Sequence, residues 1–363
     1  MSSSTIELRK PIAGDVPIAR ALDALVRPGE LFEKLDSQRV RCYACAHRCL
    51  IGDGARGICQ VRYNRGGTLY VPYGYVAALN PDPTEKKPFF HILPGSTTLT
   101  FGMLGCDLHC ANCQNWDISQ ALRDPEAGYA PQLTSAEQIV AIARRTGAQL
   151  IGSSYNEPLI TSEWAIEIFK LAQQHNIRGI YVSNGNATRE TLEFIRPYVV
   201  GYKIDLKTMQ DKQYRKLGTT LSHILDTIKM AKEMGFWVEI VTLVIPGFND
   251  SSAELMDTAQ FIRSVSLDIP WHVTAFHPDY KMADADFTPP STLIRAAEIG
   301  QETGLHFVYA GNLPGGVKNY ENTYCPKCNT VLVERYAYRI LRDQLTGKGV
   351  CLKCGEKIPG IWM

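Results

Sequence analysis

Eleven cysteines fall into three groups whose spacing could bind metal ions or metal clusters. The groups are Cys42, Cys45, Cys49 and Cys59; then Cys106, Cys110 and Cys113; then Cys325, Cys328, Cys351 and Cys354. In a reducing compartment such cysteines are metal ligands more often than disulfide partners. Two groups have the four thiolates that fill a tetrahedral site, whereas the middle group is one ligand short. The middle group is therefore the candidate reactive site.

The C-terminal group has the spacing C-x2-C, 22 residues, C-x2-C, which is typical of zinc ribbons and rubredoxin-type knuckles. Four thiolates leave no open position on a tetrahedral ion, so the pattern predicts a structural zinc. The alternative is four reduced cysteines without a metal. The residues between the two knuckles, Thr330–Arg342, predict a small hairpin or a short helix.

The N-terminal group, C-x2-C-x3-C-x9-C, has a less standard spacing. Zinc and a second iron–sulfur cluster both suit four soft thiolate ligands. The spacing differs from the C-x2-C-x2-C-x3-C run of bacterial ferredoxins. The sequence favours a structural metal over a second cluster, with His47 as an alternative ligand.

The middle group has the spacing C-x3-C-x2-C and follows an apolar, β-branched segment. Three thiolates on one short loop can hold three corners of a [4Fe–4S] cube. The fourth iron then stays open, so it can chelate a small ligand and take part in chemistry. The alternative is a three-thiolate zinc site that His109 completes.

This loop needs a scaffold, and the sequence predicts one in which strands alternate with helices. Strands are expected at Thr97–Leu104, Gln149–Tyr155, Gly179–Ser183, Tyr202–Leu206, Trp237–Ile245, His272–Phe276 and His306–Ala310. Helices are expected at Ser135–Thr146, Thr161–His175, Arg189–Arg196, Leu221–Met234, Ser252–Val265 and Ser291–Glu302. This alternation predicts βαβ units and a parallel sheet. Right-handed crossovers bring the carboxyl ends of all strands to one face, where barrels of this type carry their sites.

The C-x3-C-x2-C motif resembles the cluster motif of the radical S-adenosylmethionine (SAM) superfamily. Within it, the chain from Cys42 to the C-terminus is most similar to the pyruvate formate-lyase activating enzyme group, and more narrowly to the AmmeMemoRadiSam-system radical SAM enzymes. The resemblance implies an α/β fold with a partial (β/α)6 TIM-type barrel, which here carries small cysteine-rich metal-binding domains at both ends. It also implies that Cys106, Cys110 and Cys113 hold a [4Fe–4S] cluster whose open iron binds SAM. One electron then cleaves SAM to methionine and a 5′-deoxyadenosyl radical, which abstracts hydrogen from a substrate.

The resemblance assigns SAM-binding roles to polar residues at two of the predicted strand ends. Asn156 and Glu157 follow the second strand, where family members bind the amino group of SAM, although the two glycines usual there are replaced. A carboxylate suits an ammonium group, and the alternative for Glu157 is a helix-leading acid that the dipole stabilises. Ser183 and Asn184 end the third strand, near the ribose or methionine of SAM, but Asn-Gly is also a common turn.

Asp205 and Lys207 end the fourth strand, and Asp-x-Lys matches the activating-enzyme group, in which these side chains sit at the active site. Strand alternation places both on one face, where they could hold the zwitterionic methionine part of SAM. The alternative is an ion pair inside the barrel. His277, at the carboxyl end of the sixth strand, is a candidate catalytic residue on the substrate side, and His272 would point to the opposite face.

The cysteine groups divide the chain into three expected regions. Residues 1–94 carry the N-terminal four-cysteine motif, residues 95–312 form the radical SAM barrel, and residues 313–363 form a zinc-ribbon-like domain. The proline-dense segment Asn80–Pro94 is expected to link the first region to the barrel. Gly311–Asn322 is expected to link the barrel to the ribbon.

Composition excludes several other classes of protein. Of 363 residues, 45% are hydrophobic, and 38 Lys and Arg nearly balance 37 Asp and Glu, which argues against a dedicated nucleic-acid binder. No apolar run reaches the ~20 residues of a membrane-spanning helix, and the N-terminus lacks the apolar centre of a secretion signal. The sequence therefore predicts a cytoplasmic protein without a membrane partner.

Three functions compete on this sequence. The preferred one is a radical SAM enzyme acting on a small-molecule substrate, because metal domains at both ends are unlike the short activases. The first alternative is an activase that installs a glycyl radical on a partner protein, since fold and cluster do not specify a substrate. The second is an iron–sulfur electron carrier without SAM chemistry, which the missing thiolate disfavours. Either enzyme needs a one-electron reductant such as flavodoxin or ferredoxin.

Overall fold

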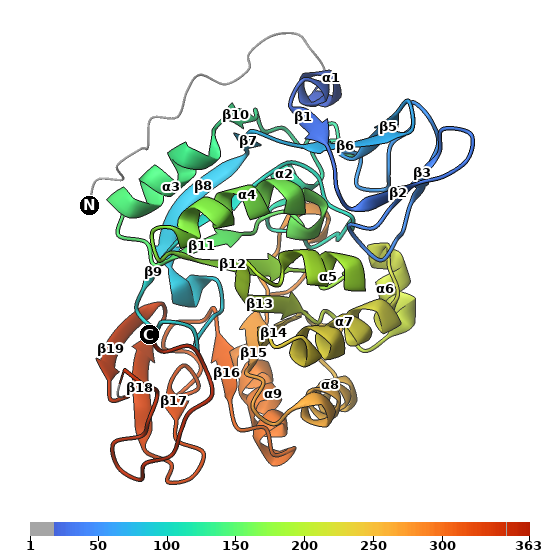
Figure 1. The fold of residues 1–363 in the computed structure, drawn as a ribbon. Coiled ribbons are helices and arrows are strands. Elements are labelled where there is room, and N and C mark those ends of the chain that lie inside the picture. Colours follow the sequence, from blue (N-terminus) through green and yellow to red (C-terminus); the bar gives the residue numbers. More distant parts are fainter. Residues whose placement is uncertain (1–17, 346) are drawn as a thin grey trace.

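A computed structural model describes residues 18–345 and 347–363 of the chain, and a large sheet forms its centre (Figure 1). The eight strands lie in the order β16-β15-β14-β13-β12-β11-β9-β8. The parallel strands are β9 (Thr97–Gly102), β11 (Leu150–Ser153), β12 (Arg178–Ser183), β13 (Val199–Asp205), β14 (Trp237–Val244), β15 (Trp271–Ala275) and β16 (Val308–Gly311). The eighth strand, β8 (Ala78–Pro83), runs antiparallel to β9. Because β8 and β16 are edge strands that do not pair with each other, the sheet is open.

Amphipathic helices connect the parallel strands. They are α3 (Ala136–Arg145), α4 (Ser162–Gln173), α5 (Arg189–Ile195), α6 (Asp211–Leu217), α7 (Leu221–Glu233), α8 (Ser252–Val265) and α9 (Pro290–Glu302). In α3, the Ser135 side chain accepts a hydrogen bond from Gln138, whose side chain accepts one from the Ser135 backbone, so this capping box fixes the start of the helix. The mixed α/β class, the parallel sheet and the seven strands and six helices expected from sequence are confirmed.

The N-terminal module is built from short antiparallel strands. Its elements are α1 (Ile18–Asp23), β1 (Val26–Pro28), β2 (Phe32–Lys34), β3 (Val40–Cys42), β4 (Leu50–Ile51), β5 (Tyr63–Arg65), β6 (Thr68–Pro72) and β7 (Tyr75–Val76), which pairs with β10 (Gln132–Leu133). Fully buried Arg62 joins the module to α4 by two hydrogen bonds, of 2.7 and 2.8 Å, to the Glu163 carboxylate. A bidentate pair of this kind fixes the module on the central domain.

A small ribbon at the C-terminal end lies on the far side of the sheet from the N-terminal module (Figure 1). Its strands are β17 (Thr323–Tyr324), β18 (Val331–Tyr336) and β19 (Arg339–Asp343), and the β18–β19 hairpin confirms the element expected between the knuckles. Buried Arg335 donates a 2.9 Å hydrogen bond to the Phe90 carbonyl and lies 4.2 Å from the centre of the Phe90 ring. Ile361 exchanges two backbone hydrogen bonds of 2.7 Å with His91 and Leu93. The ribbon therefore packs on segment 85–93.

The linker expected at Asn80–Pro94 is wrong. Its first residues belong to β8, and η1 (Thr84–Lys86) follows. Phe89, Phe90 and Ile92 are buried between the sheet and the ribbon. Proline density predicts a linker, but here the prolines lie in an edge strand and at turns. The aromatic residues of the segment are part of the hydrophobic core. In the segment 311–322, by contrast, only Gly311 belongs to a helix or strand.

Candidate active site

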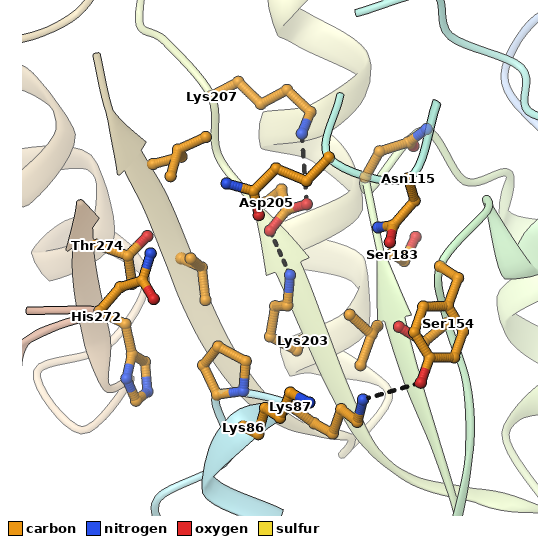
Figure 2. A pocket seen from close by; sticks show the side chains of 18 of the residues that line it. Lys86, Lys87, Asn115, Ser154, Ser183, Lys203, Asp205, Lys207, His272 and Thr274 are labelled. Atoms are coloured by element: carbon orange, nitrogen blue, oxygen red, sulfur yellow. Dashed lines mark hydrogen bonds and ion pairs between the residues drawn. The ribbon is translucent and has the colours of Figure 1, made fainter. Parts of the chain in front are cut away.

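A cavity of about 420 Å³ opens at the carboxyl ends of the parallel strands. Its walls combine the loop after β9, the ends of β11 to β16, segment 85–90 and one residue of the ribbon, Tyr338. Lys203 and Asp205 at the end of β13, with Lys207 two residues beyond it, form a charged row in the middle of the cavity (Figure 2). Segments that are distant in sequence therefore meet around one cavity.

Cys106, Cys110 and Cys113 lie on the loop after β9 and line this cavity. Burial raises the pKa of all three thiols, that of Cys110 to about 11, while the Lys207 charge works against this rise at Cys110 and Cys113. An iron ligand must be a thiolate, so the nearby lysine favours the ligating form.

The loop fits a cluster better than a single metal ion. The three sulfurs do not all lie within 4.8 Å of one another, as ligands of one ion would. His109, the alternative fourth ligand, does not line the cavity, and its ring packs against the backbone of Gly218, where a Cβ would lie 2.7 Å from its Cε1 atom. The three-thiolate zinc site with His109 is therefore not supported.

Asp205 lies between two lysines in the cavity. Its carboxylate pairs with Lys203, and its Oδ2 atom lies 3.3 Å from Lys207 Nζ. Burial opposes ionisation of Asp205, but the two lysine charges outweigh it and hold its pKa below the usual value. Burial raises the cost of charging Lys207 as well, yet Asp205 and Cys110 raise its pKa. Asp205 and Lys207 are therefore charged at neutral pH, whereas burial lowers the pKa of Lys203.

Glu157 is fully buried and connects two strand ends. Its Oε1 atom accepts hydrogen bonds from Ser183 Oγ at 2.7 Å and Leu159 N at 3.1 Å, and its Oε2 atom accepts one from Asn184 N at 2.7 Å. Asn156 beside it accepts a 3.1 Å hydrogen bond from Met103 N. The four residues expected to bind SAM at these strand ends therefore lie together on the cavity wall.

A Glu157→Gln variant is expected to change how stability depends on pH. Burial and the nearby Asp107 charge raise the pKa of Glu157 to about 8. Between about pH 5 and 8 the unfolded chain has lost this proton while the folded chain keeps it, so wild-type stability falls as pH rises. Glutamine does not titrate, so the variant's melting temperature should gain several degrees relative to wild type over this range.

Thermal melts of both proteins at pH 5 and pH 8 measure this difference. Glu163→Gln is the matched control, because the Arg62 charge holds the pKa of buried Glu163 below its usual value and its titration is complete below pH 5. Parallel melting curves for Glu157→Gln and wild type from pH 5 to pH 8 would contradict the raised pKa.

His272 inside β15 and His277 just after it lie in different surroundings. His277 is exposed, does not line the cavity, and its Nε2 atom lies 3.0 Å from the Gln114 amide nitrogen. His272 is buried and lines the cavity, with its Nε2 atom 2.7 Å from Glu239 Oε2. The structure thus puts His272, rather than His277, in contact with the cavity.

Sequence reasoning missed several residues of the cavity wall. Lys203 could have been found, since it is two residues from Asp205 on the same strand face. Lys87, which binds Asp82 at 2.8 Å and lies 4.8 Å from the centre of the Tyr155 ring, comes from the segment taken for a linker. Glu85 and Tyr338 line the cavity because segments distant in sequence pack together, which no local sequence pattern predicts.

The N-terminal cysteines lie in the module beside the loop after β9. Burial raises the pKa of Cys45, Cys49 and Cys59, that of Cys59 to about 12, and the neighbouring Cys42 adds to each rise. Ligand atoms of Cys45, His47 and Asp107 lie within 4.8 Å of one another. The N-terminal cysteine group therefore lies next to Asp107, the residue that follows Cys106.

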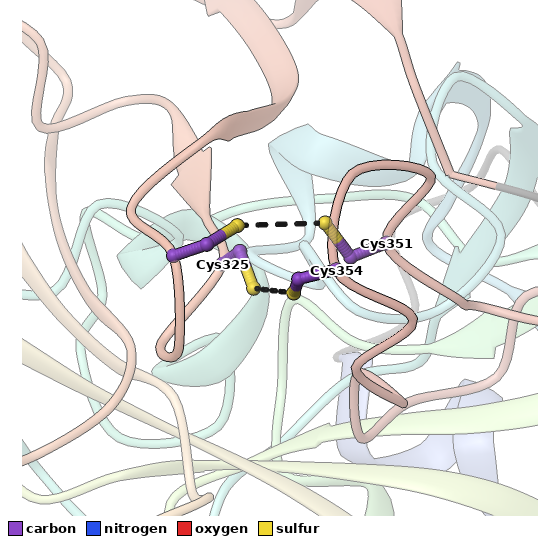
Figure 3. Close-up of side chains that lie close together, drawn as sticks. Cys325, Cys351 and Cys354 are labelled. Carbon is purple, nitrogen blue, oxygen red and sulfur yellow. Dashed lines mark hydrogen bonds between the residues drawn. The ribbon is translucent and has the colours of Figure 1, made fainter.

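The C-terminal cysteines form a compact set (Figure 3). Cys325 and Cys354 have their sulfurs 3.5 Å apart, and those of Cys328 and Cys351 are 3.8 Å apart. All four sulfurs lie within 4.8 Å of one another. Zinc–sulfur bonds of about 2.3 Å at tetrahedral angles place sulfurs about 3.8 Å apart, so these residues could hold one zinc ion.

Helices in the described part of the chain lack the combination of length and apolar character that a bilayer crossing demands.

Comparison with known proteins gives a consistent set of relatives. Residues 101–262 match the sequence family described as the radical SAM superfamily. An uncharacterized protein of Methanocaldococcus jannaschii is 38% identical over 337 residues, which cover 92% of this chain and 99% of that protein. A GTP 3′,8-cyclase of Aquifex aeolicus is 23% identical over 256 residues, covering 62% of this chain and 75% of the cyclase. A pyruvate formate-lyase-activating enzyme of Staphylococcus aureus is 23% identical over 194 residues, covering 51% and 76%.

Proposed function

The chain belongs to the radical SAM superfamily, and from this premise we propose that it cleaves SAM reductively and abstracts hydrogen from a small-molecule substrate. Cys106, Cys110 and Cys113 would hold the [4Fe–4S] cluster. The bound cluster supplies the electron that breaks SAM into methionine and a 5′-deoxyadenosyl radical. One observation carries the proposal: the three thiols and the charged row on β13 line the same cavity.

In this proposal Asp205 and Lys207 bind the amino-acid part of SAM. Asp205 can accept hydrogen bonds from its ammonium group, and Lys207 can donate to its carboxylate. The two side chains now pair with each other across 3.3 Å. Because the ligand presents the same two charges, it can exchange partners with this pair without leaving a charge unpaired.

Glu157 would act as a positioning residue for SAM. Both of its oxygens already accept hydrogen bonds, from Leu159, Ser183 and Asn184. It thereby fixes the turn at the end of β12, where Ser183 and Asn184 face the cavity with Asn156 beside them. These polar groups would orient the ribose or methionine of SAM and replace water around it.

The part of the cavity away from the cysteines would take the substrate. Aromatic side chains of Phe90, Tyr155, Tyr309 and Tyr338 line it together with His272. The cavity of about 420 Å³ also takes SAM in this proposal, so the space that remains suits a metabolite-sized substrate. The GTP 3′,8-cyclase among the relatives is named for a small-molecule reaction, which agrees with this choice.

The activase remains the alternative, favoured by the similarity to a pyruvate formate-lyase-activating enzyme. We further propose a zinc ion at the C-terminal cysteines, a reductant of the flavodoxin or ferredoxin type, and a place in the cytoplasm. The sheet would form the partial (β/α)6 barrel of the AmmeMemoRadiSam-system branch. Residues 1–94, 95–312 and 313–363 would be its three domains, with β8 of the first completing the sheet of the second.

The test is SAM cleavage by anaerobically reconstituted protein. With dithionite as the only reductant, wild type is expected to form 5′-deoxyadenosine, and Cys106→Ala, Cys110→Ala and Cys113→Ala together should reduce this to background. The triple variant should also lose about four irons per chain. Asn112→Ala with Gln114→Ala is the control on the same loop and should keep the iron. Unchanged iron and cleavage in the triple variant would refute the proposal.

The same assay separates the two enzyme functions. Cell extract is divided into a small-molecule filtrate and a protein fraction, and each is added to the reaction. A metabolite enzyme should form more 5′-deoxyadenosine with the filtrate. Stimulation by the protein fraction alone would favour the activase.

A further inference from the structure

The two four-cysteine groups differ in how closely their sulfurs approach. At the C-terminal end all four sulfurs lie within 4.8 Å of one another. Among the described residues, no three of the N-terminal sulfurs do so; only Cys45 belongs to such a group, with His47 and Asp107. A zinc ion with bonds of about 2.3 Å needs sulfurs about 3.8 Å apart. The N-terminal sulfurs are too widely spaced for a single ion.

These four cysteines nevertheless belong to one small module. Cys42 N donates a 3.0 Å hydrogen bond to the Cys49 carbonyl, and Cys45 closes the turn between them through a 3.0 Å bond from Arg48 N. Ile58 N donates to Cys49 Sγ at 3.5 Å, which brings the neighbouring Cys59 to the same hairpin. Three of the thiols are buried and Cys49 is partly buried. The four ligands are therefore gathered, but around a volume larger than one ion.

A polynuclear cluster suits such a wide set of thiolates. In a [4Fe–4S] cube the irons stand at corners and each thiolate lies outside its own iron, so the sulfurs are farther apart than around one ion. Cys106, Cys110 and Cys113 share this wide spacing, since they too form no group within 4.8 Å. The N-terminal set thus matches the proposed catalytic loop rather than the C-terminal site.

We propose that Cys42, Cys45, Cys49 and Cys59 hold a second iron–sulfur cluster, which passes electrons to the one on Cys106, Cys110 and Cys113. The metal site stands on the cysteine geometry alone, whereas the electron transfer rests on the proposed function. Four protein ligands leave no open iron, so this cluster carries electrons and does not bind SAM.

The contact between the module and the loop after β9 supports the electron-transfer role. The buried carboxylate of Asp107 lies near a cysteine of each group. Cys106 Sγ lies 3.7 Å from its Oδ1 atom, and Cys45 Sγ lies within 4.8 Å of one of its oxygens. Asn184 and Asn186 donate 2.8 Å hydrogen bonds to this carboxylate and hold it in place. Asp107 therefore connects the two cysteine groups through Cys45 and Cys106.

Gly105 allows this close approach. Its φ of 89° is one that glycine adopts readily, and a Cβ there would lie 3.0 Å from the carbonyl oxygen of Cys59. The loop before Cys106 thus packs directly on the module. In each turnover, an external one-electron donor would reduce the second cluster, which is reoxidised when it passes that electron on for the cleavage of one SAM.

Metal analysis of the full-length, anaerobically reconstituted protein tests the site. Wild type is expected to hold about eight irons and as many sulfides per chain, because each cube contains four of each. Cys106→Ala, Cys110→Ala and Cys113→Ala together should leave about four irons. The matched control, Cys325→Ser with Cys351→Ser, should change zinc and not iron. About four irons with two zinc ions in wild type would overturn the proposal.

Electron paramagnetic resonance of the dithionite-reduced protein tests the relay. Two reduced clusters on cysteine groups that both contact Asp107 should give a spectrum broadened by spin–spin interaction, and the triple variant should give a narrow signal. A wild-type spectrum that is the simple sum of two narrow signals would overturn the relay. Eight irons without any SAM cleavage would refute the proposed function and leave the metal site intact, whereas cleavage with four irons would do the reverse.

Discussion

Replacing Asp205 by asparagine is expected to slow SAM cleavage at low SAM concentration roughly 30- to 4,000-fold. Loss of one partner from a desolvated charged contact costs about 2–5 kcal/mol, and that range gives this factor. Asp205 is the one acid in the row on β13, so the variant leaves nothing there for an ammonium group and leaves Lys203 and Lys207 unpaired. Lys207→Met should act in the same direction by removing the partner of the SAM carboxylate.

The measurement is 5′-deoxyadenosine formed from SAM and dithionite without substrate, which isolates cleavage from later steps. The matched controls are Asp226→Asn and Lys229→Met, an exposed pair 3.9 Å apart on α7 that does not line the cavity. Melting temperatures of all four variants show whether folding is affected. Normal cleavage by the Asp205 and Lys207 variants, with lowered melting temperatures, would mean that the charged row is only an internal ion network.

Removal of the C-terminal metal site is the second change with a large expected effect. Cys325→Ser with Cys351→Ser takes one ligand from each knuckle, and both side chains are buried in the ribbon core. Structural zinc binding contributes about 10–16 kcal/mol in small zinc domains, so the ribbon should unfold. Tyr338 would then leave the cavity wall, and Arg335 would no longer hold Phe90, which also lines the cavity, so turnover of substrate should fall more than SAM cleavage.

Zinc content, thermal melts and limited proteolysis of residues 313–363 measure this effect. Leu332→Ala is the control, because it creates a cavity in the same core at a cost of about 2–5 kcal/mol and should leave the zinc content unchanged. A double-serine variant that melts like wild type and resists protease would show that the ribbon does not depend on a metal.

The superfamily and the central sheet could be predicted because their signals are local. Three cysteines within eight residues define the loop, and apolar strands alternate with amphipathic helices over more than 200 residues. The row on β13 follows from the alternation of side chains along one strand, and it could have included Lys203. The confirmed family then gives these local patterns their chemical meaning.

The rest of the cavity could not be predicted because it depends on contacts between distant segments. His272 is held in the cavity wall by Glu239 on the neighbouring strand, whose Oε2 atom lies 2.7 Å from His272 Nε2. Glu85 lines the cavity because segment 85–93 lies between the sheet and a ribbon whose Arg335 is about 250 residues later in the chain. The sequence favours His277 for its place at a strand end, yet the side chain of His277 is exposed.

The prolines of β8 explain how the open sheet avoids pairing with other chains at this exposed edge strand. Pro81 and Pro83 are two residues apart, so their nitrogens face the same side of the strand, and β9 occupies the other side. A proline nitrogen carries no hydrogen, so this outer edge offers no donor at either position. Another chain cannot add itself there as a ninth strand in regular register. The proline density of Asn80–Pro83 is thus a protection against aggregation, and a Pro81→Val, Pro83→Val chain would expose a continuous row of donors to its neighbours.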